Sequence, residues 1–207
     1  MSTDTIDRFR RLPLNAHRFL DGVPLHSLDF VELPGGPSGM SMPQLREAIG
    51  FDKIGEQELG FVPKALFGLR GLIGKMFGWD DVPQLVESNS YLSQLSDADR
   101  AKSLIPPGKT EGINRIIYCF ENEQMMEIIN RTVHCFWVLA SQPLPGGYGL
   151  YVAVYVKRLN WRTPIYMAVI TPMLKWIIYP AMLNGVKRAW LNRFPTGKTS
   201  LPLQKVG

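Results

Sequence analysis

Cysteine is scarce in this chain, and its few cysteines stand apart from other reactive residues. The 207 residues include two, Cys119 and Cys135, each inside an apolar run without a C-x-x-C motif. Isolated cysteines in apolar runs are typical of buried free thiols and fit a reducing compartment. The first residues, MSTDTIDRFRRLPLN, lack the apolar segment of a secretory signal. We therefore expect a cytoplasmic protein without disulfides, with membrane association as the alternative.

The sequence also lacks the short motifs that identify common cofactor sites and catalytic nucleophiles. It has no P-loop, no G-x-G-x-x-G after a strand, no G-x-S-x-G and no H-E-x-x-H. The glycine-rich PGGPSGMS has no lysine to hold a phosphate, which indicates a turn. His17 and Asp21 lie four residues apart, and His26 and Asp29 three apart, but neither pair has a third ligand nearby. We expect neither a metal nor a cofactor.

Positive charge is present but dispersed. The net charge is +5, and the basic residues form small groups instead of one cluster. Proteins that bind nucleic acid usually concentrate lysine and arginine on one face. The dispersed pattern therefore predicts no nucleic-acid partner, and favours a solvated surface or a weak attraction to anionic lipid. It does not indicate an oligomeric state.

The length of the chain favours one domain. We expect a flexible segment over residues 1–20, a single domain over 21–194 and a flexible tail over 195–207. VPLHSLDFVELP alternates like a first strand, and SMPQLREAIGF begins with a capping serine and a proline suited to a first helical turn. A second helical stripe follows within residues 62–79, and residues 80–112 give no clear pattern.

The pattern changes to strands after residue 112. INRIIYCFEN and GYGLYVAVYVKRL alternate with period two, and Leu150, Val152 and Val154 oppose Tyr151 and Tyr155. EQMMEIINRTVHCFWVLAS forms one long strand or two strands broken near residue 130. Sequential strands with short connections predict an antiparallel sheet.

The least polar stretch, residues 164–186, allows two interpretations. It is long enough for a membrane span, but Lys175 at its centre disfavours insertion. Pro172 and Pro180 predict kinks. A kinked helix that packs along the concave side of the sheet is the favoured interpretation, and a membrane anchor is the alternative.

Two segments resemble a known family. DFVELPGGPSGMSMPQLREAIGF and YVKRLNWRTPIYMAVITPMLKWIIYPAML are similar to a bacterial and fungal family of unknown function. It belongs to the superfamily of START domains, polyketide cyclases and pollen allergens (SRPBCC). The resemblance covers Leu25 to Trp190 and implies an α+β helix-grip fold. In that fold a curved antiparallel sheet wraps around a long C-terminal helix, and two short helices follow the first strand. The family often carries a histidine soon after the first proline of that helix, whereas this chain has Lys175, so no functional residue is transferred.

A helix-grip fold has room for a hydrophobic small molecule between the sheet and the last helix. The expected function is to bind an apolar or lipid-like ligand there, without a cofactor. The expected lining is rich in aromatic residues and methionine, although the plainer interpretation of any single one is that it fills a core: Tyr118, Phe120, Phe136, Tyr151, Tyr155, Tyr166, Met167, Met173 and Trp176.

His134 is the most suggestive titratable residue. Its ordinary pKa lies near neutral pH, so it could act with Tyr118 and Tyr155 as a proton-transfer group in a cyclase, isomerase or lyase. The plainer interpretation is a structural histidine with a satisfied partner. Glu127 and Arg131 share the opposite parity and would form an ion pair on the outer face; inside a cavity, Arg131 would instead hold an anion or enolate. A peripheral contact with a membrane through the last helix is the third alternative.

Overall fold

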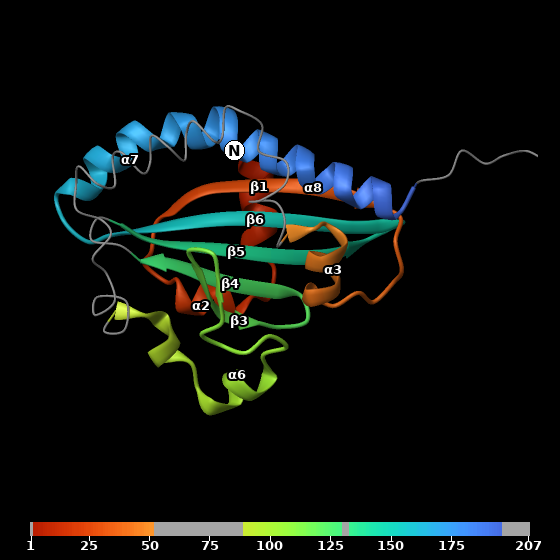
Figure 1. Ribbon diagram of the computed structural model, residues 1–207, viewed down its shortest axis with the longest axis horizontal. Helices are drawn as coiled ribbons and strands as arrows, with labels where there is room; N and C mark the ends of the chain where they lie inside the picture. The colour runs from red at the N-terminus through yellow and green to blue at the C-terminus, as the bar shows by residue number, and fades with distance from the viewer. Residues whose placement is uncertain (1, 52–88, 130–132, 196–207) are drawn as a thin grey trace, which may run out of the picture.

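The computed structural model describes residues 2–51, 89–129 and 133–195. Its centre is a curved six-stranded sheet with the strand order β1-β6-β5-β4-β3-β2, in which every neighbouring pair is antiparallel (Figure 1). The strands are Leu25–Pro34 (β1), Thr110–Glu111 (β2), Asn114–Cys119 (β3), Glu123–Ile129 (β4), Val133–Leu144 (β5) and Gly147–Arg158 (β6). β4 and β5 are separate antiparallel strands, so the version broken near residue 130 is confirmed.

The last helix is continuous and has three parts. These are α7 (Arg162–Met173), the π-helical turn η3 (Leu174–Ile178) and α8 (Tyr179–Arg193), together called the C-terminal helix. The π-helical turn lies between Pro172 and Pro180, which cannot donate the usual backbone hydrogen bonds. The predicted α+β fold, with its antiparallel sheet and long C-terminal helix, is confirmed.

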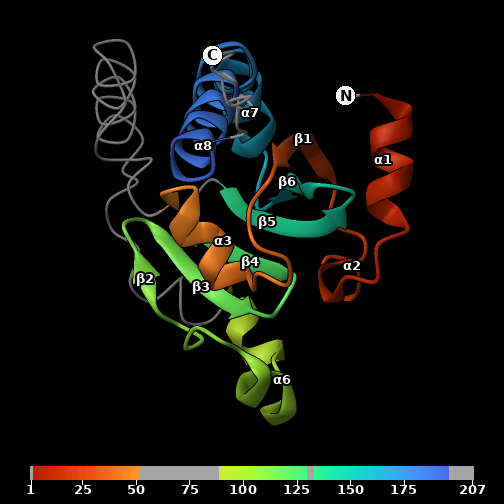
Figure 2. The same ribbon diagram turned by 90° about the vertical axis from the view of Figure 1, so that its right-hand side faces the viewer.

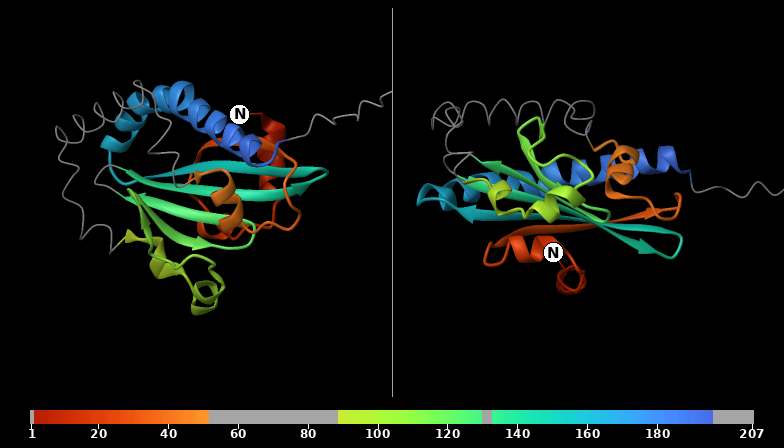
Figure 3. Two further views of the ribbon diagram at one scale, coloured as in Figure 1. Left: turned by 45° about the vertical axis from the view of Figure 1, so that its right-hand side comes forward. Right: turned by 90° about the horizontal axis from the view of Figure 1, so that it is seen from below.

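The two faces of the sheet carry separate hydrophobic cores. On the first face, α1 (Thr3–Arg10), α2 (Asn15–Phe19) and the short η2 (Tyr91–Gln94) cover the sheet. On the second face, α3 (Met42–Ala48) and α8 pack against the sheet. Figure 2 shows α1 and α2 on one side of the strands and α3, α7 and α8 on the other. The remaining helix, α6 (Asp97–Lys102), lies away from both layers (Figure 3).

The N-terminal segment differs from the prediction. Instead of a loose, polar start, residues 3–19 contain α1 and α2, and Phe9 of α1 is fully buried against the first face. Most residues of these helices are polar or basic, and the few apolar residues that face the sheet did not stand out in the sequence. The other predicted boundaries stay predictions, and the helix predicted within residues 62–79 lies outside the described residues.

The short helix after β1 begins as predicted. Ser41 precedes α3, Pro43 stands in its first turn, and the Gln44 side chain accepts a hydrogen bond from the Ser41 amide at 2.9 Å. This hydrogen bond pairs an amide at the start of the helix that would otherwise have no acceptor. Arg46, nearly fully buried, then pairs with Glu111 of β2 at 2.5 Å, which ties the helix to the edge of the sheet.

Candidate functional site

The aromatic residues expected to line the pocket do not share a face with the C-terminal helix. Five of them lie in the core of the first face, under α1, α2 and η2: Tyr118, Phe120, Phe136, Tyr151 and Tyr155. Alternation in β6 is as predicted, since Leu150 and Val152 lie on the second face while Tyr151 and Tyr155 lie on the first. The correction is that the C-terminal helix packs on the aliphatic side, because the N-terminal helices already cover the aromatic side.

In β3 the pairing itself is irregular. The register shifts between Ile116 and Tyr118, opposite Met126 and Met125 of β4. A bulge of this kind changes which side chains share a face. Ile116 consequently lies in the core beside α8, and Tyr118 in the core beside α2, although simple alternation predicts that they share a face.

The candidates from the C-terminal helix are also divided. Met167 is half-buried and packs at the junction between helix and sheet, and Met173 is half-buried too. Trp176 is 79% exposed and does not face the sheet. The side chain of Tyr166 lies outside the described part of the chain. Among the eight predicted lining residues whose side chains the structure describes, Met167 is therefore the one within the helix–sheet core.

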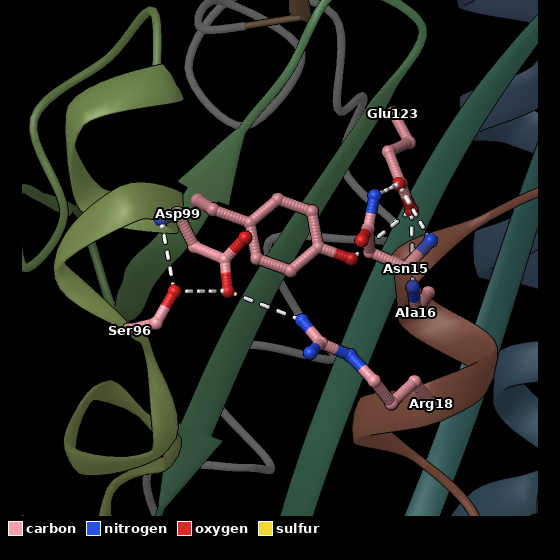
Figure 4. A network of polar contacts seen from close by, with 7 residues as sticks. Asn15, Ala16, Arg18, Ser96, Asp99 and Glu123 are labelled. Carbon is pink, nitrogen blue, oxygen red and sulfur yellow. Dashed lines mark hydrogen bonds and ion pairs between the residues drawn. The ribbon is translucent and has the colours of Figure 1, made fainter.

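Tyr118 belongs to a polar network that holds α2 on the sheet (Figure 4). Its hydroxyl donates to the buried carboxylate of Glu123 at 3.0 Å. The same carboxylate accepts hydrogen bonds from the Asn15 amide at 2.7 Å, the Asn15 side chain at 2.8 Å and the Ala16 amide at 3.1 Å. Burial and the neighbouring Glu123 raise the pKa of Tyr118 well above its ordinary value. This arrangement suits a structural anchor for α2 and leaves the tyrosine poorly suited to proton transfer.

His134 has a buried partner that parity in a single long strand did not predict. Its Nε2 lies 2.9 Å from Oε2 of Glu127, and both side chains are 1% exposed. Ser90 donates to the other carboxylate oxygen, and the Tyr91 amide donates to Oε2 at 3.1 Å. The predicted outer-face pairing of Glu127 with Arg131 is wrong for Glu127, since the hairpin pairing of β4 with β5 turns it inward beside His134.

The three predicted catalytic residues do not converge on one point. Tyr118 pairs with Met125, which pairs with Val138, whereas His134 pairs with Ile129. Four residues along a strand separate His134 from Val138, a distance of roughly 13 Å. Burial raises the pKa of Tyr155. Catalysis by this set stays a prediction, and the arrangement of these side chains accounts for stability more directly.

A different group of polar residues lies where the C-terminal helix meets the sheet. Ser27 of β1 and Tyr179 of α8 are buried, and neither hydroxyl has a hydrogen-bond partner in the described part of the protein. Burial raises the pKa of Tyr179 to about 12, and the nearby Ser27 hydroxyl opposes that rise. The two hydroxyls are therefore neighbours across the helix–sheet boundary without a hydrogen bond of good geometry between them. We call this place the helix–sheet junction.

Apolar side chains surround these hydroxyls. Tyr179 belongs to a core with Val133, Val154 and Val156 of the sheet. Half-buried side chains complete its edge: Cys135, Trp137, Met167, Leu174, Ile178 and Met182. Burial raises the pKa of Cys135 to about 12, so it is a poor nucleophile at neutral pH. The junction therefore offers hydroxyl hydrogen-bonding groups within an apolar lining.

Two further polar residues lie at the rim of the junction. His26 Nε2 is hydrogen-bonded to the Thr171 hydroxyl at 3.3 Å. Burial, and to a smaller extent the charge of Lys175, lower the pKa of His26. Asp29 follows on β1, half-buried, with its pKa raised by burial. The spacing of His26 and Asp29 suggested a weak metal pair; a register shift between Leu25 and Ser27 interrupts the alternation of β1, and both residues lie beside the C-terminal helix.

One comparison with known proteins identifies the family. The model of a family described as a protein of unknown function (DUF2867) matches residues 20–181. The chain belongs to the DUF2867 family. No curated protein matches it at a significant level. In this DUF2867 protein the matched range includes both Ser27 and Tyr179, whereas α1 and Trp190 lie outside it.

This DUF2867 protein also has an open cleft at the other end of the C-terminal helix. The cleft has a volume of about 400 Å³ and is lined by residues 37–40, by Gln44, Glu47 and Ala48 of α3, and by Arg193 and Phe194. It is separated from Tyr179 by fourteen helical residues, or about 21 Å. Within the described ranges, none of the helices has the length and apolar character that crossing a membrane requires.

Replacing Asp29 with Asn is expected to stabilise the protein at neutral pH. Burial raises the pKa of this carboxyl, so the folded state disfavours its ionised form more than the unfolded state does. The penalty is present once pH exceeds the folded pKa, and it disappears below the ordinary value of 3.8. Thermal unfolding of Asp29→Asn should therefore show a higher Tm than the wild type at pH 7, with the gain vanishing on acidification.

The exposed Asp21 provides a matched control for this substitution. Asp21→Asn removes the same charge outside the junction, so its Tm should stay close to that of the wild type across the pH range. An equal gain in both variants would attribute the effect to net charge instead of burial.

Proposed function

We propose that this protein binds a small, largely apolar molecule at the helix–sheet junction, and that the Ser27 and Tyr179 hydroxyls hold the ligand's polar group. The observation that carries the proposal is the pair of buried hydroxyls without partners on facing elements. A buried hydroxyl without a hydrogen bond costs about 1–3 kcal/mol. A ligand carbonyl or hydroxyl that accepts from them would remove much of this cost.

The surroundings support a ligand that is otherwise apolar. Valines from β5 and β6 form the floor, and half-buried Trp137, Met167 and Met182 border it. Methionine side chains adapt to ligands of irregular shape. The resemblance to the helix-grip superfamily adds support, because members of that superfamily place ligands between the sheet and the last helix.

The proposal moves the binding groups relative to the sequence-based expectation. The place, between sheet and C-terminal helix, is the one expected, but the aromatic side chains of the first face do not contribute. Ser27, Cys135, Trp137 and Tyr179 replace them. Enzyme activity at this junction is not part of the proposal, since the thiol and the phenol both hold their protons firmly at neutral pH.

Tyr179→Phe and Tyr148→Phe form a pair of variants that tests the proposal. Nile red, an apolar dye with a carbonyl acceptor, serves as the probe, and its fluorescence is titrated with protein. Tyr179→Phe should weaken dye binding about three- to tenfold, the range for one hydrogen bond. Its unfolding free energy should stay equal or rise, because an unpaired buried hydroxyl is removed.

Tyr148 lies on the same face but has partners for its hydroxyl. It donates to the Pro37 carbonyl at 2.7 Å and accepts from the Met40 amide at 2.9 Å. Tyr148→Phe should therefore lower stability by about 1–3 kcal/mol and leave dye affinity unchanged. Equal dye affinity in the wild type and Tyr179→Phe would refute the role of this hydroxyl. Native mass spectrometry of the purified protein checks whether a natural ligand is retained.

A further inference from the structure

The outward side of the C-terminal helix carries exposed aromatic and basic residues. Trp176 is 79% exposed, and Ile177 beside it is 37% exposed. Trp161, immediately before α7, is 73% exposed. Lys175 and Lys187 are exposed on the same helix. Large exposed apolar side chains next to one another mark interaction sites more often than scattered single ones do.

Helical spacing places several exposed residues on one side. Trp176, Pro180, Asn184 and Lys187 are exposed and follow one another at intervals of four, four and three residues, the spacing of one helix face. Lys175 is exposed beside this face, four residues before the buried Tyr179. The buried residues of α8 are Tyr179, Val186 and Trp190, and they face the sheet. We call the exposed set Trp161, Lys175, Trp176, Ile177 and Lys187 the outer helix surface.

The charge of this part of the chain is of one sign. Glu127 is the last acidic residue, and residues 128–207 contain no Asp or Glu. The C-terminal helix itself carries Arg162, Lys175, Lys187, Arg188 and Arg193. Such a segment attracts an anionic surface, and two copies of it repel each other, which disfavours a dimer formed through this face.

Tryptophan beside lysine is the combination that suits the boundary of a bilayer. Indole rings settle at the level of the lipid headgroups, where one end is apolar and the other is wet. Each lysine near an anionic leaflet strengthens binding about fivefold. We propose that the outer helix surface docks the protein on anionic membranes, with Trp176 and Ile177 entering the headgroup region. In this position the helix lies along the membrane, and the sheet is on its far side (Figure 1).

Vesicle sedimentation tests the docking directly. The two probes are vesicles of phosphatidylcholine alone and vesicles of equal parts phosphatidylcholine and phosphatidylserine. The wild type should sediment with the anionic vesicles and much less with the neutral ones, and salt should release it. Lys175→Glu should weaken binding by more than tenfold, since it removes one favourable charge and adds an unfavourable one. Trp176→Ser should weaken it by a similar factor and reduce the blue shift of tryptophan emission on vesicle addition.

Two substitutions at the other end of the molecule serve as controls. Lys102 is exposed at the end of α6, and Ile113 is 55% exposed beside β3. Lys102→Glu makes the same charge change, and Ile113→Ser likewise replaces an exposed apolar side chain with serine. Both lie away from the outer helix surface, so vesicle binding should be preserved. Near-ultraviolet circular dichroism checks that every variant keeps its fold.

Several results would overturn the proposal. These are no sedimentation with anionic vesicles, equal sedimentation with both kinds of vesicle, or loss of binding in the controls as large as in Lys175→Glu and Trp176→Ser. Retention on immobilised polyglutamate without vesicle binding would replace the membrane by an acidic protein partner. Docking does not depend on the proposed ligand, so Tyr179→Phe should bind vesicles as the wild type does.

Discussion

Trp190→Ala is expected to lower the free energy of unfolding by about 3–5 kcal/mol. The indole is fully buried in the core between α8 and the sheet. Its Nε1 donates to the Pro34 carbonyl at the end of β1, at 2.8 Å. Truncation would therefore leave a large cavity and an unpaired carbonyl at once. Urea unfolding followed by circular dichroism measures the loss.

The backbone beside Trp190 leaves little room for adjustment. A Cβ at Gly36 would come within 2.7 Å of the indole ring, and the Gly36 φ of +85° favours glycine on conformational grounds. Tyr148 and Phe194 pack against the same ring. These contacts hold the end of the C-terminal helix against the segment that follows β1. The loss of unfolding free energy in Trp190→Ala should therefore include weakened packing of the whole second face.

Trp176→Ala is the matched control, because it removes the same side chain from the same helix. Its ring is 79% exposed, so the change in unfolding free energy should stay within about 0.5 kcal/mol. Comparable losses in the two variants would mean that the helix does not present Trp190 to the sheet and Trp176 to solvent.

Local sequence patterns predicted most of the fold. Period-two alternation located β1, β3 and β6, the capping serine and proline located the start of α3, and the apolar stretch with two prolines located the C-terminal helix. These features depend on neighbours within a few residues. The N-terminal helices were missed because α1 has only 8 residues and α2 only 5, and so short a run with few apolar residues resembles a polar chain end.

The site was harder to predict because it depends on which face of the sheet each layer covers. Alternation in β6 separates Tyr151 from Val152, but it cannot say which of them meets the C-terminal helix. That choice follows from the docking of α1 and α2 on the first face. The docking depends on hydrogen bonds from the Asn15 and Ala16 amides to the Glu123 carboxylate, which lies more than one hundred residues further along the chain. The Ser27–Tyr179 neighbourhood likewise joins distant segments, and no spacing in the sequence indicates it.

His134→Ala and Glu127→Ala should each lower the free energy of unfolding by about 3–5 kcal/mol, the usual cost of removing one partner of a buried pair. Without Glu127, His134, the Ser90 hydroxyl and the Tyr91 amide would all lose an acceptor. Glu127→Gln keeps one oxygen, so its loss should be smaller, about 1–3 kcal/mol. Chemical unfolding of the three variants at one pH provides the comparison.

The double variant Glu127→Ala/His134→Ala decides whether the two residues act as a unit. Residues in direct contact are not additive, so the double variant should lose at least about 1 kcal/mol less than the sum of the single variants. A structural pair also predicts that His134→Ala, where it remains folded, binds Nile red as the wild type does, because His134 lies on the aromatic face and the helix–sheet junction on the other. Additive losses together with weakened dye binding would instead give His134 a part in the ligand site and contradict the separation of the two faces.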